Sequence, residues 1–265
     1  MVIKLSVVII TYNEEKNIAR TLRAATSVAD EIVVLDSYST DNTANICASF
    51  NVCFFQQPWK GYANAKNYAN TLASYDWILS LDADEELSSE LIASIQAFKQ
   101  REPTVPTVGI ITRLPNYCGF WIRYSGWNPD KKVRLFNRKW AFWQGEYIHE
   151  KVCYQVPVKE VHLHGFCYHY TVHTLEEHME AINKFSSLQV QELADRSAPL
   201  NCYHLIIKPL AEFIRSYIVK GGFRDGWPGF IVCSFNAFSK FLKYAKYWLH
   251  KRTQNRLKKK ISLED

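Results

Sequence analysis

The 265-residue chain is long enough for one large α/β domain or a domain with an appendage, and its 48% hydrophobic residues include no run of the roughly 18 needed to span a bilayer. Seven cysteines without a Cys-x-x-Cys pair, and no secretory signal, predict a cytoplasmic protein. The net charge is +6, and residues 226–263 carry nine Lys and Arg but no acid, so we expect an anionic partner for this end of the chain.

The first 81 residues alternate between apolar runs and helical patterns. We expect Asn13 to cap the first helix, with Glu14 and Glu15 in its first turn. The predicted strands cover residues 5–10, 31–35, 52–55 and 77–81, and the predicted helices cover residues 13–25, 43–50 and 63–74. This order implies a parallel sheet with right-handed crossovers.

Four carboxylates follow the strand at 77–81 within five residues. Asp82 and Asp84 are two apart in an extended segment, so their side chains can point toward one place. Carboxylate oxygens suit Mg²⁺ or Mn²⁺, which can bind a diphosphate at the carboxyl end of a strand. The same motif is also compatible with an acidic turn before a helix capped by Ser88 or Ser89.

The residues that follow the first two predicted strands argue against two classes of nucleotide-binding protein. A dinucleotide-binding dehydrogenase requires a glycine-rich loop where this chain has Thr11-Tyr-Asn-Glu14, and a P-loop is also absent. Asp36 ends the second strand, where an acid can bind a ribose hydroxyl or a base N–H.

Seven short motifs extend along nearly the whole chain. The first half contains Thr11-Tyr-Asn-Glu-Glu-Lys-Asn17, Asp36-Ser-Tyr-Ser-Thr-Asp-Asn-Thr43 and Leu81-Asp-Ala-Asp-Glu85. The second half contains Gly126-Trp-Asn-Pro-Asp130, Val133-Arg-Leu-Phe-Asn-Arg138, Ile148-His-Glu150 and Gly221-Gly-Phe-Arg-Asp-Gly-Trp227. Together they resemble the inverting family 2 glycosyltransferases, in particular the bacterial branch that includes lipopolysaccharide-core β-1,4-glucosyltransferases. The resemblance implies a GT-A fold: a Rossmann-like, mainly parallel sheet flanked by helices, with a helical C-terminal extension.

The resemblance also implies roles for single residues. It places Thr11 and Glu14 in a uridine pocket, Asp36 at the uracil or ribose, Asp82 at the ribose and the metal, and Asp84 on the metal that holds the diphosphate. We assign Lys66 and Arg134 to the same nucleotide-sugar site. Asp36 and Asp41 could instead cap helices, and Tyr12 is expected to pack rather than to stack on the base.

Glu150 is the candidate general base, because an inverting transfer requires a group that takes the proton of the acceptor hydroxyl. It lies outside a charge run and beside His149, and the family resemblance points to the same residue. The alternative is a surface glutamate paired with Lys151. Glu85 and Glu86 are rival bases, but they lie closer to the metal pair.

Four histidines lie between residues 162 and 173 with the alternation of a strand. Their spacing fits no closed zinc site, so most are expected to be structural. In some GT-A enzymes a histidine completes the metal shell, and we assign this role to His169.

The last third of the chain is predicted to be helical. A Thr174 cap precedes a helix over 175–195, and a second helix covers 200–219 before a glycine-rich break. One helical face then carries Ile231, Phe235, Phe238, Leu242, Ala245 and Leu249. This helix could lie on an anionic membrane surface, with Lys240, Lys243, Lys251 and Arg252 contributing, or pack on its own domain. We therefore divide the chain into a glycosyltransferase domain at 1–172, with a nucleotide-sugar half at 1–113 and an acceptor half at 114–172, and a basic helical region at 173–265.

These features predict a glycosyltransferase, peripheral on the inner face of the cell membrane, that requires Mg²⁺ or Mn²⁺. It would transfer a hexose, with glucose favoured, from a UDP-sugar to a hydroxyl of lipopolysaccharide core or a related envelope glycan or glycolipid. A nucleotidyltransferase or phosphatase on a related sheet, and a non-catalytic nucleotide-binding protein at a membrane surface, are the alternatives. Nucleic acid is not expected as a partner, because the aromatic residues of the basic region form no stacking platform.

Overall fold

The computed structural model describes residues 2–100, 102–145 and 150–261. It divides into two compact units, the first formed by residues 1–114 and 130–170 and the second by residues 115–129 and 171–265. The boundary near residue 170 lies close to the expected one, but residues 115–129 group with the C-terminal helices rather than with the expected acceptor half. The assignment of donor and acceptor functions to parts of the chain stays a prediction.

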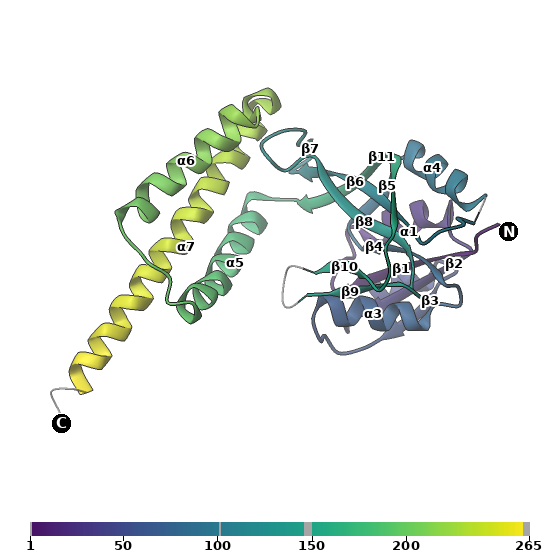
Figure 1. The fold of residues 1–265 in the computed structure, drawn as a ribbon, viewed down its shortest axis with the longest axis horizontal. Helices are drawn as coiled ribbons and strands as arrows, with labels where there is room; N and C mark the ends of the chain where they lie inside the picture. Colours follow the sequence, from purple (N-terminus) through teal and green to yellow (C-terminus); the bar gives the residue numbers. More distant parts are fainter. Residues whose placement is uncertain (1, 101, 146–149, 262–265) are drawn as a thin grey trace. The chain divides into compact units, whose positions relative to one another are not determined.

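The first unit is built on a mixed sheet with helices on its faces (Figure 1). Its first strands and helices are β1 (Leu5–Thr11), α1 (Ile18–Thr26), β2 (Glu31–Asp36), α2 (Thr43–Ala48), β3 (Cys53–Gln56), α3 (Tyr62–Leu72) and β4 (Trp77–Asp82). They are followed by β5 (Glu85–Leu87), α4 (Ser89–Lys99), β6 (Thr107–Tyr117), β8 (Asp130–Asn137), β9 (Ala141–Gln144), β10 (Lys151–Tyr154) and β11 (Lys159–Val172).

The predicted parallel arrangement is confirmed for the first four strands. In the order β3-β2-β1-β4-β8-β6-β11-β5, the neighbours from β3 to β4 pair in parallel. From β4 onward, β8 pairs antiparallel with β4 and β6, and β5 pairs antiparallel with β11. β9 and β10 form a separate antiparallel pair.

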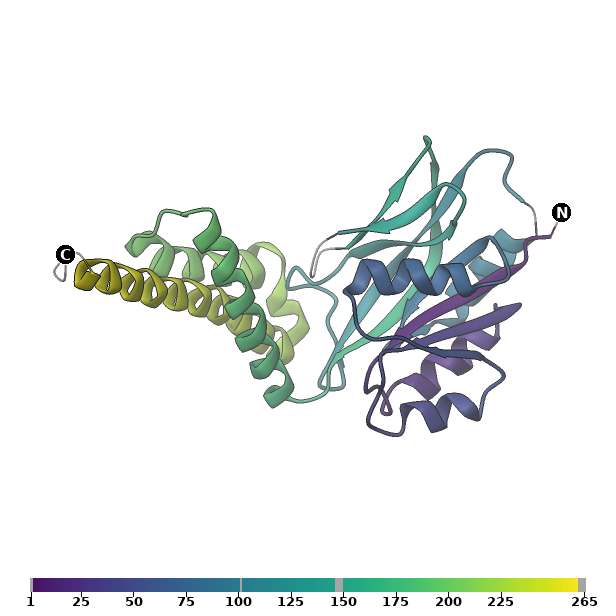
Figure 2. The same ribbon diagram turned by 90° about the horizontal axis from the view of Figure 1, so that it is seen from below.

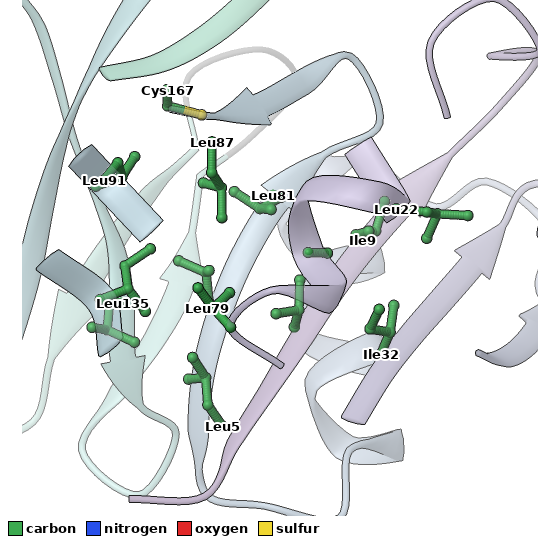
Figure 3. Close-up of a cluster of buried hydrophobic side chains, with 14 of the residues drawn as sticks. Leu5, Ile9, Leu22, Ile32, Leu79, Leu81, Leu87, Leu91, Leu135 and Cys167 are labelled. Atoms are coloured by element: carbon green, nitrogen blue, oxygen red, sulfur yellow. The ribbon is translucent and has the colours of Figure 1, made fainter. Parts of the chain in front are cut away.

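Burial on both faces explains the continuous apolar run of β1. Val7 and Ile9 belong to a cluster with residues of α1, α2 and α4, which Figure 3 shows in part. Val8 and Ile10 point to the opposite face and pack with alanines of α3. A strand covered in this way has no solvent-facing positions, so its sequence does not alternate.

Two local features of the first unit differ from the predictions. α1 begins at Ile18 rather than near Asn13, which has a φ of 55°. The backbone amides of Asn13 and Glu14 donate to Ser39 Oγ and Thr43 Oγ1, both at 2.8 Å, so they bind the loop after β2 instead of starting a helix. The second difference is β5, a short strand that was not among the predicted strands. Ser88 does cap α4 as expected, accepting a hydrogen bond from the Leu91 amide.

The second unit is mainly helical, as expected. It contains β7 (Phe120–Trp121), α5 (Leu175–Asp195), the π-helical turns η1 (Tyr203–Ile207) and η2 (Arg215–Val219) on either side of α6 (Lys208–Ile214), the 3₁₀ turn η3 (Gly222–Asp225), and α7 (Gly226–Ile261). The predicted cap of α5 is confirmed, because Thr174 Oγ1 accepts from the Glu177 amide at 3.2 Å.

The long helix α7 packs on α5 and α6 (Figure 1, Figure 2). Its most deeply buried side chains include Val232, Cys233, Tyr244 and Tyr247, whereas Leu249 of the predicted apolar face is 56% exposed. Both tyrosines make polar contacts, since Tyr247 donates to the Ala198 carbonyl at 2.8 Å and Tyr244 accepts from Lys208 Nζ at 3.1 Å. No helix in the described part of the chain is both long and apolar enough to cross a membrane.

Candidate active site

The carboxyl ends of three parallel strands bring predicted site residues to one edge of the sheet. Thr11 of β1 is in register with Asp36 of β2, and Ile10 of β1 is in register with Asp82 of β4. Thr11 is 5% exposed, and its hydroxyl finds no hydrogen-bond partner within the described residues. A buried hydroxyl without a partner is costly, so this atom is available to a ligand at the edge.

Asp36 stabilises the loop that follows β2. It is fully buried, and its carboxylate accepts from Ser39 Oγ at 2.5 Å and from Gln56 Nε2 at 3.0 Å. Asp41, expected as a capping residue, accepts from the amide and hydroxyl of Thr43. Both acids therefore order the loop after β2, and direct contact of Asp36 with a uracil or ribose stays a prediction.

Glu14 lies in the loop after β1 and accepts from Asn17 Nδ2 at 2.8 Å. Burial raises the pKa of Glu14 to about 7; the Asn17 hydrogen bond opposes this rise, while the negative charges of Asp84, Asp41 and Asp82 add to it. The Glu14 carboxyl is therefore partly protonated at neutral pH. A protonated carboxyl can donate a hydrogen bond.

Lys66 connects the end of β4 with the candidate base. Its side chain, on α3, is 1% exposed, and its ammonium lies 2.9 Å from Asp82 Oδ1 and 3.0 Å from Glu150 Oε1. It also lies over the Trp143 ring at 4.5 Å from the centroid. A buried ammonium held between two carboxylates fixes the positions of both.

Arg134 makes the second set of ion pairs with Asp82. Its Nη2 lies 2.5 Å from Asp82 Oδ2 and 2.8 Å from Glu85 Oε1, and Arg113 Nη1 binds the same Glu85 oxygen at 3.1 Å. Burial would raise the pKa of Asp82, but the charges of Arg134 and Lys66 outweigh it and hold that pKa well below its usual range. Within the described residues, Nε and Nη1 of Arg134 are buried without a partner, which leaves them available to an anion.

Pairing of β5 with β11 brings His169 to Asp84. His169 is in register with Glu85, and its Nε2 lies 3.1 Å from Asp84 Oδ2. Burial would lower the pKa of His169, but the charge and hydrogen bond of Asp84 raise it. The predicted proximity of these two residues is thus observed.

These residues fit a divalent cation in part. Asp84 and His169 supply one oxygen and one nitrogen ligand, a donor pair that suits Mn²⁺. Both oxygens of Asp82 are instead occupied by Lys66 and Arg134, and within the described residues no three His, Cys, Asp or Glu side chains converge. A cation here would therefore need further oxygens from the ligand, and ligation by Asp82 stays a prediction.

The sequence did not predict that Glu85 and Arg113 are important for the structure of the site. Glu85 is fully buried, so it is poorly placed for the alternative role of base, and it also accepts from the Asp82 amide at 3.0 Å. This burial results from the pairing of β5 with β11, and no short-range pattern in the sequence predicts it. Tyr12, expected to pack, is 55% exposed at the site edge. Ile148 and His149 of the Glu150 motif lie outside the described residues.

Comparison with known proteins gives consistent results. The family model described as Glycosyl transferase family 2 matches residues 6–155. An uncharacterized glycosyltransferase of Rickettsia typhi is 31% identical over 251 residues, covering 92% of this chain and 86% of that protein. The lipopolysaccharide core biosynthesis glycosyltransferase LpsC of Rhizobium meliloti is 29% identical over 251 residues, covering 92% of each chain.

A solved structure of similar fold is the mannosyltransferase PcManGT from Pyrobaculum calidifontis in complex with GDP-Man and Mn²⁺. The TM-score is 0.53 at 13% identity, with 94% of this chain and 88% of that chain covered. This likeness confirms the predicted GT-A fold with its C-terminal helical region. Because the family model spans more than half of the chain and a 31% identical relative spans nearly all of it, this protein belongs to glycosyl transferase family 2.

Proposed function

We propose that the first unit transfers a hexose, with glucose favoured, from UDP to an acceptor hydroxyl with inversion at the anomeric carbon. The observation that carries this proposal is the Lys66 bridge, which holds the proposed base Glu150 beside Asp82 at the carboxyl end of β4. Single-displacement transfer requires a base close to the bound donor, which we place at this edge of the sheet.

The donor would lie along the carboxyl edge of β1, β2 and β4. The unpaired Thr11 hydroxyl and the carboxyl of Glu14 would contact the nucleoside, and the unpaired nitrogens of Arg134 would bind the diphosphate. Asp84 and His169 would hold Mg²⁺ or Mn²⁺, which neutralises charge on the leaving diphosphate when bound. The solved neighbour with GDP-Man and Mn²⁺ supports a metal in this fold.

Glu150 would accept the proton of the acceptor hydroxyl. The acceptor oxygen then forms a bond to the anomeric carbon while the bond from that carbon to the diphosphate oxygen breaks, and the electron pair leaves with the nucleoside diphosphate. Attack from the face opposite the leaving group converts an α-linked donor into a β-linked product. The name of LpsC supports a sugar of lipopolysaccharide core as the acceptor.

We also propose that the second unit attaches to the inner membrane surface. Four residues spaced by four form what we call the apolar stripe along η1, α6 and η2, and all are well exposed: Ile206 63%, Leu210 55%, Ile214 44% and Ile218 60%. Exposed apolar surface of this extent is typical of an interaction site, and the basic residues of α7 favour an anionic lipid surface.

Thermal stabilisation by UDP-glucose, UDP-galactose, UDP-GlcNAc and GDP-mannose, each with Mn²⁺ or with a chelator, tests the donor proposal. We expect UDP-glucose with Mn²⁺ to raise the melting temperature most. Asp84→Asn should remove the metal-dependent part of this shift, whereas the matched change Asp76→Asn, at an ion pair with Lys139, should keep it. Equal stabilisation with chelator, or in Asp84→Asn, would contradict the metal assignment, and a preference for GDP-mannose would contradict the nucleotide.

A further inference from the structure

The second unit contains a polar cavity of about 350 Å³. Residues of the 125–127 segment, α5, α6, η2 and α7 line it, and their side chains are almost all polar or charged. The lining includes the cations Arg215, Lys220, Lys240 and Lys243 and one carboxylate, Glu212. Four positive charges and one negative charge leave the cavity a formal charge of +3.

Two of the cations have no carboxylate partner among the described residues. Glu212 is occupied, because its carboxylate binds Arg215 Nη2 at 2.6 Å and also binds Lys240. Lys220 and Lys243 make no ion pair within the part of the chain that the structure describes, and Lys243 only lies 5.0 Å from the centroid of the Tyr244 ring. Clustered ammonium groups without counter-charges repel one another and favour an anion between them.

Of the two motifs that the proposed chemistry does not use, the 126–130 motif contributes Gly126 and Trp127 to the lining, and the 221–227 motif holds the loop before them. Asp225, in the 221–227 motif, accepts from the amides of Arg123 and Tyr124 at 3.1 and 2.9 Å and from Ser125 Oγ at 3.1 Å. These bonds fix the loop that leads into the 126–130 motif. Gly126 has a φ of +81°, and a Cβ there would lie 2.7 Å from Lys220 Cδ. A side chain at this position would therefore displace the Lys220 side chain from the loop.

Neutral hydrogen-bonding groups stand beside the cations. Trp127 Nε1 donates to Asn236 Oδ1 at 3.3 Å, which leaves the Asn236 amide nitrogen as a donor, and Gln189 and Ser239 add an amide and a hydroxyl. Ammonium and amide donors together match the oxygens of a phosphoryl group, and the hydroxyl suits an attached sugar. We propose that this cavity binds a phosphoryl group carried by a larger ligand, either a phosphorylated saccharide or the headgroup of a phospholipid.

The test uses the full chain with ¹⁵N-labelled tryptophan, and the indole resonance of Trp127, assigned with Trp127→Phe, reports on the cavity. Inorganic phosphate, glucose 6-phosphate and phosphatidylglycerol vesicles are added separately at constant ionic strength. We expect a saturable shift with glucose 6-phosphate, and an affinity about tenfold or more lower in Lys220→Gln/Lys243→Gln, since two charge-assisted contacts are lost. Both lysines lack ion-pair partners among the described residues and lie among other cations, so their replacement should not lower the melting temperature.

Lys184→Gln is the matched control, because it removes the same charge from an exposed position of α5 outside the cavity. Saturation by glucose 6-phosphate identifies a soluble phosphorylated sugar as the source. A response to vesicles alone that is lost in Lys220→Gln/Lys243→Gln identifies a headgroup in the cavity. A Trp127 resonance that no probe moves, or an equal loss of binding in Lys184→Gln, would overturn the proposal. UDP-sugar binding, measured in the same variants, should be unchanged, so failure here is distinct from failure of the transferase proposal.

Discussion

Lys66 Nζ lies 3.0 Å from Glu150 Oε1, although 84 positions separate the two residues in the chain. The ammonium is buried and also binds Asp82 at 2.9 Å, so one cation links α3, the end of β4 and the segment before β10. Because a buried charge is stable only when it is paired, these three residues are expected to act as a unit.

Replacing Lys66 by Gln tests this unit. Asp82 and Glu150 would lose their shared cation, and we expect the free energy of unfolding to fall by about 3–5 kcal/mol, as when one member of a buried ion pair is removed. Donor affinity should fall as well, because the edge of the sheet where we place the diphosphate loses a positive charge. Lys60→Gln, at an exposed site, is the control and should behave as wild type in denaturant titrations. An unchanged unfolding free energy in Lys66→Gln would show that the bridge does not stabilise the fold.

Glu150→Gln separates donor binding from proton transfer. The amide keeps the size of the side chain but is not a base, so transfer should slow by about 10²–10⁴ while the Kd for the donor stays the same. Single-turnover kinetics and donor titration measure the two quantities, with Glu160→Gln on β11 as the control. Near-normal transfer would move the role of base to another carboxylate, and a parallel loss of donor binding would indicate a positioning role for Glu150.

Glu85 and Glu86 are neighbours with different burial, which makes them a matched pair. Glu85 is fully buried between Arg113 and Arg134, whereas Glu86 has a side chain that is 32% exposed and accepts from the Tyr170 hydroxyl. Glu85→Gln should lower the free energy of unfolding by about 3–5 kcal/mol, because two guanidinium groups each lose one of their carboxylate partners. Glu86→Gln should cost about 1 kcal/mol or less. Equal losses of unfolding free energy in the two variants, measured by chemical denaturation, would contradict the structural importance of Glu85.

Glu14 should make the stability of the metal-free protein depend on pH. Its pKa of about 7 in the folded state lies above its ordinary value of 4.5, so the folded protein holds this proton more tightly than the unfolded chain. The resulting stabilisation is complete below pH 4.5 and is lost as the pH rises through 7. Glu14→Gln should flatten this part of the stability profile, while Glu102→Gln, at an exposed position, should not. Parallel profiles for wild type and Glu14→Gln would contradict the burial of this carboxyl.

The sequence predicted what depends on local pattern and strand order. The β1–β4 core follows from continuous apolar runs, and the parallel order alone places Thr11, Asp36 and Asp82 at one edge. What it did not predict depends on contacts between distant segments. The late start of α1 results from hydrogen bonds to the loop after β2, and the burial of Glu85 results from pairing with β11. Such contacts decide whether an acid binds a ligand or a neighbouring arginine.

The apolar stripe predicts reversible attachment to anionic vesicles through Leu210 and Ile214. Changing both to Ser should reduce vesicle binding by about tenfold or more, because each side chain would otherwise bury apolar area in the lipid interface. Both residues are well exposed, so the melting temperature and transfer to a soluble acceptor should not change. Val105→Ser, at an exposed apolar position in the first unit, is the control for co-sedimentation at low salt. Equal binding by wild type and the double variant, or binding by neither, would show that the stripe does not contact the membrane.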